Sequence, residues 1–197
     1  MKQFLAHIEK ERVAALPVVT APANIMVVKT QKEADFAASV LMQQQVIGFD
    51  TETRPSFTPN THYKIALLQL AAADSVFLCR LQHIGEHQGL KAVLESPDIL
   101  KVGLSVKDDF RMLQRWMKIE PQNFVELQNY APKFGIEDKS LQKIYAIVFG
   151  KRISKSQQLS NWEAPILSQP QKDYAAIDAW TCRELYFEFK KIEESII

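Results

Sequence analysis

The sequence predicts an α/β fold with a mixed sheet of five or six strands flanked by helices. Three apolar segments, 46–50, 65–70 and 76–79, follow one another with only turn-rich breaks between them, which is typical of an antiparallel meander. Further along the chain, apolar segments at 99–104 and 124–127 alternate with segments of helical periodicity. A meander followed by strand–helix units favours one mixed sheet with helices packed against it.

The remaining elements follow from local patterns. Residues 31–42 have apolar residues at helical spacing after Thr30, a good N-cap, and predict an amphipathic helix. Residues 25–28 suit a short edge strand, and we expect residues 1–27 to form an N-terminal arm. A polar, proline-containing loop is expected at 150–170. Four further segments are typical of helices: 90–94, 106–117, 140–149 and 171–192.

Composition limits the class of protein. The chain has 197 residues, 47% of them hydrophobic and 24% charged, which indicates one globular domain. The net charge of +1 excludes a broad basic surface, so any contacts with nucleic acid must be confined to a small area. The two cysteines, Cys79 and Cys182, lie in apolar surroundings and indicate a reducing compartment. With neither a signal-like run nor a membrane-length apolar segment, we expect a cytoplasmic protein without membrane contact.

Asp50 and Glu52 stand where a strand ends, and residues at i and i+2 of a strand point to the same face. Two such carboxylates at ~4 Å repel by about 4 kcal/mol at an effective dielectric near 20, so they need a cation or a raised pKa. The alternative is that Glu52 already lies in the following loop and is solvated.

Two predicted helices also carry acids close to an apolar face. On the helix 106–117, Asp109 lies roughly 70° from the centre of the apolar face, whereas Asp108 lies roughly 170° away and is expected in solvent. Capping of the helix N-terminus is the alternative role for Asp109. On the last helix, Asp178 follows Tyr174 by four residues and lies within roughly 50° of the apolar face. Pairing with a basic side chain is the alternative there.

Together these residues resemble the three exonuclease motifs of the DEDD superfamily, with Asp50 and Glu52 in the first, Asp109 in the second and Asp178 in the third. Tyr174 precedes Asp178 by four residues, and this spacing resembles the third motif of the tyrosine subfamily, called DEDDy. The histidine subfamily is disfavoured because none of the four histidines lies near Asp178. Flanking segments resemble the Werner exonuclease and ribonuclease D branch, and the similarity covers about residues 28–190. Those segments are 64–70, 124–127 and 159–162.

The resemblance implies a ribonuclease H-like fold in residues 28–197 and a 3′–5′ exonuclease that releases nucleoside 5′-monophosphates. It implies that four acids hold two divalent ions, Mg²⁺ or Mn²⁺, roughly 3.5 to 4 Å apart. Those acids are Asp50, Glu52, Asp109 and Asp178. Tyr174 is expected to orient the attacking water, since its ordinary pKa near 10 makes it a poor base at neutral pH.

Several residues beside the motifs are candidates for contact with the substrate. Arg54, Lys64 and Lys107 are expected at phosphates, with a solvated surface position as the alternative for each. Thr51 is a candidate for contact with the terminal sugar. We expect the aromatic residues Phe57, Trp116 and Trp162 to pack within the protein rather than to stack on a base.

The expected partner is the 3′ end of DNA or RNA, and no obligate protein partner is evident from the sequence. A different hypothesis is a nucleic-acid-binding module that kept the fold and lost catalysis. An endonuclease on the same fold is a third hypothesis, which the tyrosine-type third motif disfavours.

Overall fold

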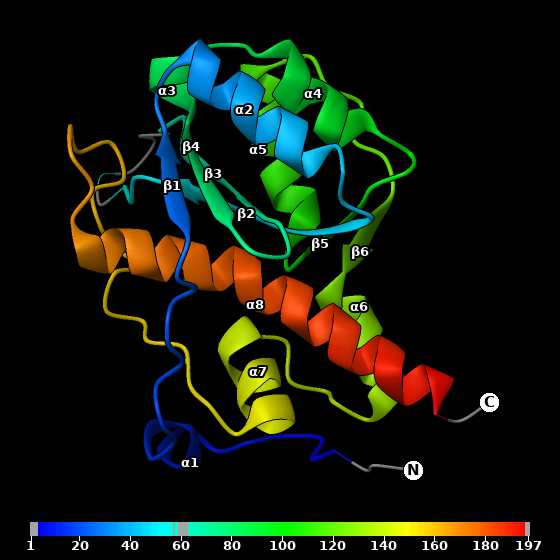
Figure 1. Cartoon of the computed structure of the whole chain (residues 1–197). Helices are drawn as coiled ribbons and strands as arrows, with labels where there is room; N and C mark the ends of the chain where they lie inside the picture. Colours follow the sequence, from blue (N-terminus) through cyan, green and yellow to red (C-terminus); the bar gives the residue numbers. More distant parts are fainter. Residues whose placement is uncertain (1–3, 57, 59–62, 196–197) are drawn as a thin grey trace.

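A six-stranded mixed sheet forms the centre of the protein. The computed structural model describes residues 4–56, 58 and 63–195 (Figure 1). The strands are β1 (Ile25–Val28), β2 (Val46–Thr53), β3 (Ile65–Ala71), β4 (Val76–Arg80), β5 (Leu100–Gly103) and β6 (Phe124–Glu126). Their spatial order is β1-β4-β3-β2-β5-β6.

The connections within the sheet match the prediction of a meander followed by strand–helix units. Strands β2, β3 and β4 are antiparallel neighbours, whereas β5 runs parallel to β2 and β6 runs parallel to β5. Strand β1 pairs in parallel with β4 at one edge. The predicted mixed sheet is therefore confirmed, with the edge strand included, and the carboxyl ends of β2 and β5 lie side by side.

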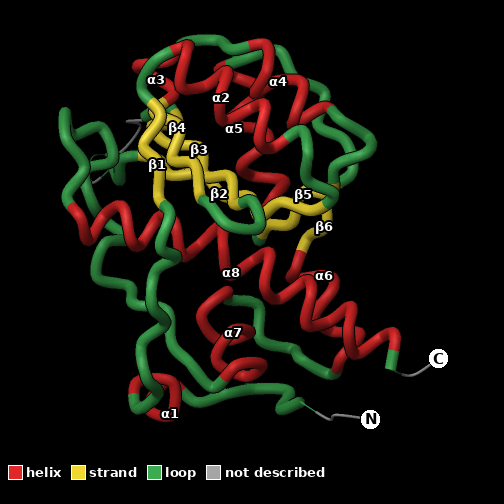
Figure 2. Tube along the Cα trace, viewed as in Figure 1, coloured by secondary structure: helices red, strands yellow, loops and turns green. Residues whose placement is uncertain are grey.

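Helices cover both faces of this sheet (Figure 2). Helices α2, α4 and α5 lie on one face, and the long helix α8 crosses the other, with α7 and α1 beyond it (Figure 1). The longer helices are α2 (Gln31–Leu41), α4 (Gln88–Glu95), α5 (Val106–Trp116), α7 (Leu141–Phe149) and α8 (Gln169–Glu194). The short ones are α1 (Lys10–Ala14), α3 (Leu81–Ile84), α6 (Leu127–Tyr130) and the 3₁₀ helix η1 (Ala131–Phe134).

Local sequence explains where two of these helices begin. Thr30 accepts a hydrogen bond from the Glu33 amide, and the Glu33 carboxylate accepts one from the Thr30 amide, which forms a capping box for α2. Ser168 and Gln171 form the same arrangement at the start of α8. The predicted helix at 31–42 is confirmed, whereas α3, α6 and η1 were not predicted because four-residue helices show no periodicity.

Helix α8 approaches the sheet very closely where small residues meet. A Cβ atom added at Gly48 of β2 would lie 1.9 Å from the carbonyl oxygen of Ala179. Ala175, Ala176 and Ala179 are fully buried in the core cluster between α8 and the sheet. This contact brings the backbone of α8 directly onto β2, two residues before Asp50.

The segment before β1 lies outside the sheet and packs against the layer beyond α8. The carbonyl oxygen of Ala6 accepts hydrogen bonds from the amides of Glu137 and Asp138, and the Arg152 guanidinium donates to the carbonyl oxygen of Leu16. The expected boundary between arm and domain at residue 27 falls within β1. In the described ranges, no helix combines the length and the apolar character required to cross a bilayer.

Candidate active site

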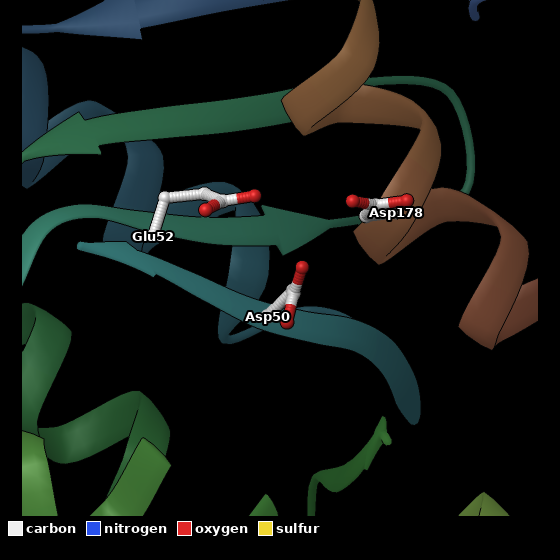
Figure 3. A group of neighbouring side chains, drawn as sticks. All are labelled: Asp50, Glu52 and Asp178. Carbon is white, nitrogen blue, oxygen red and sulfur yellow. The ribbon is translucent and has the colours of Figure 1, made fainter. Parts of the chain in front are cut away.

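Three carboxylates converge where β2 meets α8. Asp50 and Glu52 lie on the same face of β2, and Asp178 faces them from α8 (Figure 3). One oxygen of each carboxylate lies within 4.8 Å of the others. Glu52 is part of the strand, so the alternative that places it in the following loop is wrong.

Asp109 lines the same cleft, but its carboxylate makes a different contact. Thr51 points to the face of β2 opposite Asp50, and its hydroxyl donates a 2.5 Å hydrogen bond to Asp109 on α5. The N-terminus of α5 is bound by another acid, because the Glu126 carboxylate accepts hydrogen bonds from the amides of Ser105 and Val106. Asp109 therefore lies beside the three converging acids and does not cap the N-terminus of α5.

Tyr174 lies one turn before Asp178 and is buried beside it. Its ring packs against Trp162, with the ring centroids 6.0 Å apart. Burial, together with the charges of Asp178 and Glu52 and a hydrogen bond to Asp178, raises the pKa of the Tyr174 phenol. The hydroxyl is therefore protonated at neutral pH.

The described residues provide no basic partner for the acids of this cleft. Among the residues that the structure describes, no ion pair involves Asp50, Glu52, Asp109 or Asp178, so the alternative of a basic partner for Asp178 finds no support. Burial and the charges of Asp178 and Asp109 raise the pKa of Glu52 to about 9. Burial raises the pKa of Asp109 and of Asp178 to about 7, and it raises that of Asp50 together with the neighbouring charges.

These raised pKa values predict how the metal-free protein responds to pH. A carboxyl whose pKa is higher in the folded state favours folding below its unfolded pKa, near 4, and loses that contribution as pH rises through the folded value. The free energy of unfolding in EDTA should therefore fall between about pH 4 and pH 9. Urea unfolding at a series of pH values measures it, and a flat or rising profile would contradict the expectation. Excess Mg²⁺ should reduce the fall.

The candidates for substrate contact lie around the cleft rather than in it, with the exception of Thr51. Arg54 is 3.5 Å from the Glu163 carboxylate and lies over the Tyr63 ring. Lys64 and Lys107 are exposed. Trp162 is fully buried, as expected of a packing residue, whereas Phe57 and the Trp116 side chain lie outside what the structure describes.

The cleft has a volume of about 320 Å³, and sequence reasoning missed part of its lining. Lys155 is the basic side chain of that lining, and it comes from the loop between α7 and α8. No local pattern marks this loop beyond its polarity, so the position of Lys155 requires the tertiary structure. The other lining residues that were not singled out are Leu104, Ser105, Ser140, Leu141, Gln142, Gln158 and Cys182.

The donor atoms suit hard divalent cations. Asp50, Glu52 and Asp178 offer only carboxylate oxygens, which Mg²⁺ and Mn²⁺ prefer, and they offer no nitrogen or sulfur ligand that would favour zinc. A bound dication also offsets the repulsion that raises their pKa values. The residues present therefore fit a divalent metal site.

Two solved structures share the fold of this chain. The crystal structure of the Aedes aegypti Nibbler EXO domain superposes with a TM-score of 0.78 at 22% identity, over 92% of this chain and 94% of that chain. Escherichia coli RNase D superposes with a TM-score of 0.75 at 22% identity, over 85% of this chain and 46% of that chain. The ribonuclease H-like fold predicted from the sequence is thus confirmed.

Sequence comparison identifies the family. Residues 25–194 match the family described as 3′-5′ exonuclease. The mouse (Mus musculus) bifunctional 3′-5′ exonuclease/ATP-dependent helicase WRN is 31% identical over 183 residues, covering 87% of this chain. The chain belongs to the 3′-5′ exonuclease family. It spans 13% of the length of the mouse protein.

Proposed function

We propose that this protein is a metal-dependent 3′–5′ exonuclease that releases nucleoside 5′-monophosphates from the end of a nucleic acid strand. The observation that supports this most directly is the convergence of Asp50, Glu52 and Asp178 within 4.8 Å, with Asp109 in the same cleft. Four acids that form no ion pair with any described residue suit a site that is completed by cations.

The residues divide into two groups of metal ligands. Asp50, Glu52 and Asp178 would hold one divalent ion, Mg²⁺ or Mn²⁺. Asp109 would hold a second ion together with Asp50, whose pKa is raised in part by the charge of Asp109. When bound, two such ions supply the positive charge that activates a water and stabilises the leaving 3′ oxygen of an in-line displacement.

Tyr174 would orient the attacking water. Its raised pKa keeps the phenol protonated, so the hydroxyl donates a hydrogen bond and does not act as a base. Packing of the Tyr174 ring against the buried Trp162 holds the hydroxyl beside Asp178. The proton of the water would then pass to another acceptor in the cleft.

Tyr174→Phe should lower kcat by about 10- to 100-fold with little change in divalent-ion affinity, because water orientation is lost while the carboxylates remain. Tyr145→Phe is the matched control, since that hydroxyl donates to Glu184, outside the cleft, and its loss should leave kcat unchanged. Single-turnover hydrolysis measures both. Equal kcat values for Tyr174→Phe and the wild type would contradict the positioning role.

The nucleic acid contacts would be few and local. We propose that Thr51, Arg54, Lys64 and Lys107 contact the last nucleotides, in keeping with a net charge of only +1. The described E. coli relative is an exoribonuclease, and the mouse relative joins an exonuclease to a helicase. Metal and phosphate chemistry serves RNA and DNA alike, so we propose a nucleic acid 3′ end as the substrate class.

Two further assignments accompany this function. We propose that residues 1–27 act as an arm that braces the catalytic domain of residues 28–197. Cys79 and Cys182 are both buried free thiols, which accords with action in the reducing cytoplasm.

The test is a panel of single-stranded and duplex DNA and RNA labelled at the 3′ or the 5′ end, with Mg²⁺, Mn²⁺ or EDTA. We expect release of mononucleotides from the 3′ end that requires metal and is lost in Asp50→Ala. Binding without turnover would instead support an inactive binding module, and cleavage of a circular substrate would support an endonuclease. Activity that persists in Asp50→Ala would refute the proposed site.

A further inference from the structure

Gln69 is a buried polar side chain with no obvious structural role. It lies in β3 and is fully buried. Within the described part of the chain, neither its Nε2 nor its Oε1 atom has a hydrogen-bond partner. Unpartnered buried polar atoms destabilise a fold, so an apolar residue would serve packing better at this position.

The sheet register places Gln69 directly opposite Asp50. The two residues are partners in the antiparallel pair of β2 and β3, and such partners share a face with Cβ atoms about 4.5–5.5 Å apart. On this face of the sheet, Leu67 and Ala71 flank Gln69 on its own strand, and Leu78 lies opposite it on β4. Of the two residues directly opposite Gln69, Asp50 and Leu78, only Asp50 has a polar side chain.

We propose that Gln69 is a positioning residue for the metal site, whose amide donates a hydrogen bond to the Asp50 carboxylate when a divalent ion is bound. The proposal depends on the metal-binding function proposed above. A carboxylate has about four lone-pair positions, and an ion ligated by Asp50 leaves others to be satisfied. Gln69 lies opposite Asp50 in the register and is fully buried, so water does not compete for this hydrogen bond.

A neutral amide suits this place better than a basic side chain. Lysine or arginine beside Asp50 would neutralise the carboxylate and compete with the divalent ion, whereas glutamine orients it without adding charge. Hydrogen-bond partners of metal ligands fix ligand orientation, and their loss usually weakens metal binding by 10- to 100-fold. One oxygen of Asp50 lies within 4.8 Å of oxygens of both Glu52 and Asp178, so its orientation affects the whole cluster.

The first experiment uses Gln69→Met, which keeps the length of the side chain and removes both polar atoms. Mn²⁺ affinity is measured by calorimetry without nucleic acid, and we expect it to be 10- to 100-fold weaker than in the wild type. Stability in EDTA should be unchanged or higher. Leu78→Met is the matched control, because Leu78 flanks Gln69 on the side away from Asp50, and its Mn²⁺ affinity should stay within about twofold of the wild type.

The outcomes separate this inference from the proposed function. A wild-type protein that binds no Mn²⁺ would refute the metal-dependent function itself. A wild-type protein that binds Mn²⁺ and a Gln69→Met variant with affinity within twofold would overturn only the role of Gln69. Equal weakening in Leu78→Met would also overturn it, because the effect would then come from packing.

A second measurement needs no variant. The side-chain amide resonances of Gln69 in the wild type should shift on addition of Mg²⁺, and their exchange with solvent should slow. Gln171 is the internal reference, because its side-chain amide already donates to the carbonyl oxygen of Asn161. A Gln69 amide that shifts no more than that of Gln171 would refute the contact.

Discussion

Asp178→Asn should abolish hydrolysis and at the same time stabilise the metal-free protein. Loss of one carboxylate from a group that lies within 4.8 Å removes part of the proposed metal site, so we expect kcat to fall by at least about 10³-fold. At pH 8, above its pKa of about 7, Asp178 is a charge buried beside two other carboxyl groups, and this burial raises its pKa. The neutral amide should raise the free energy of unfolding in EDTA by about 1–3 kcal/mol.

Thermal unfolding at pH 8 in EDTA and then in Mg²⁺ measures the second effect. A gain of 1 kcal/mol corresponds to a rise in Tm of about 2–4 °C for a chain of this size. The control is Glu184→Gln, which neutralises another partly buried acid on α8 that accepts a hydrogen bond from Tyr145 outside the cleft. That variant should keep its activity. A drop in Tm for Asp178→Asn in EDTA would show that the buried charge of Asp178 does not destabilise the metal-free protein.

Gly48→Ala should be the most destabilising of the glycine-to-alanine changes in this chain. The added Cβ would lie 1.9 Å from the carbonyl oxygen of Ala179. This oxygen belongs to the backbone of α8, so it cannot turn aside as the end of a flexible side chain could. Relief requires α8 to shift away from β2, which opens the core between them. We expect a loss of at least about 3 kcal/mol in the free energy of unfolding.

The same shift would carry Asp178 away from Asp50, so any folded fraction of Gly48→Ala should bind Mn²⁺ more weakly. Gly150→Ala provides the comparison, because nothing lies within 4 Å of its added Cβ and the cost comes from the left-handed backbone, φ +64°. That cost is roughly 1–2 kcal/mol. Equal stability of the two variants in urea would contradict the close approach of α8 to β2.

Much of the candidate site could be predicted because its acids lie on periodic elements. Alternation along β2 places Asp50 and Glu52 on one face, and helical phase places Asp178 on the buried face of α8. The same reasoning indicates that Asp108 faces solvent, and its side chain is indeed 79% exposed. Periodicity identifies such positions since burial repeats with the geometry of the element.

Other features depend on contacts between distant segments and have no local signal. The capping of α5 by Glu126 requires the parallel pairing of β5 and β6, and the bond between Thr51 and Asp109 requires α5 to lie beside β2. In the sequence, Gln69 is one polar residue within an apolar strand. Its proposed role beside Asp50 follows only from the register of β2 and β3.

The position of α8 at the end of the order of elements has a consequence for synthesis in the cell. The strand that carries Asp50 leaves the ribosome long before α8, which supplies Asp178 and covers that face of the sheet. A nascent chain that stops before residue 178 therefore lacks one of the three converging carboxylates. The acidic cleft is thereby completed only after translation has passed Asp178.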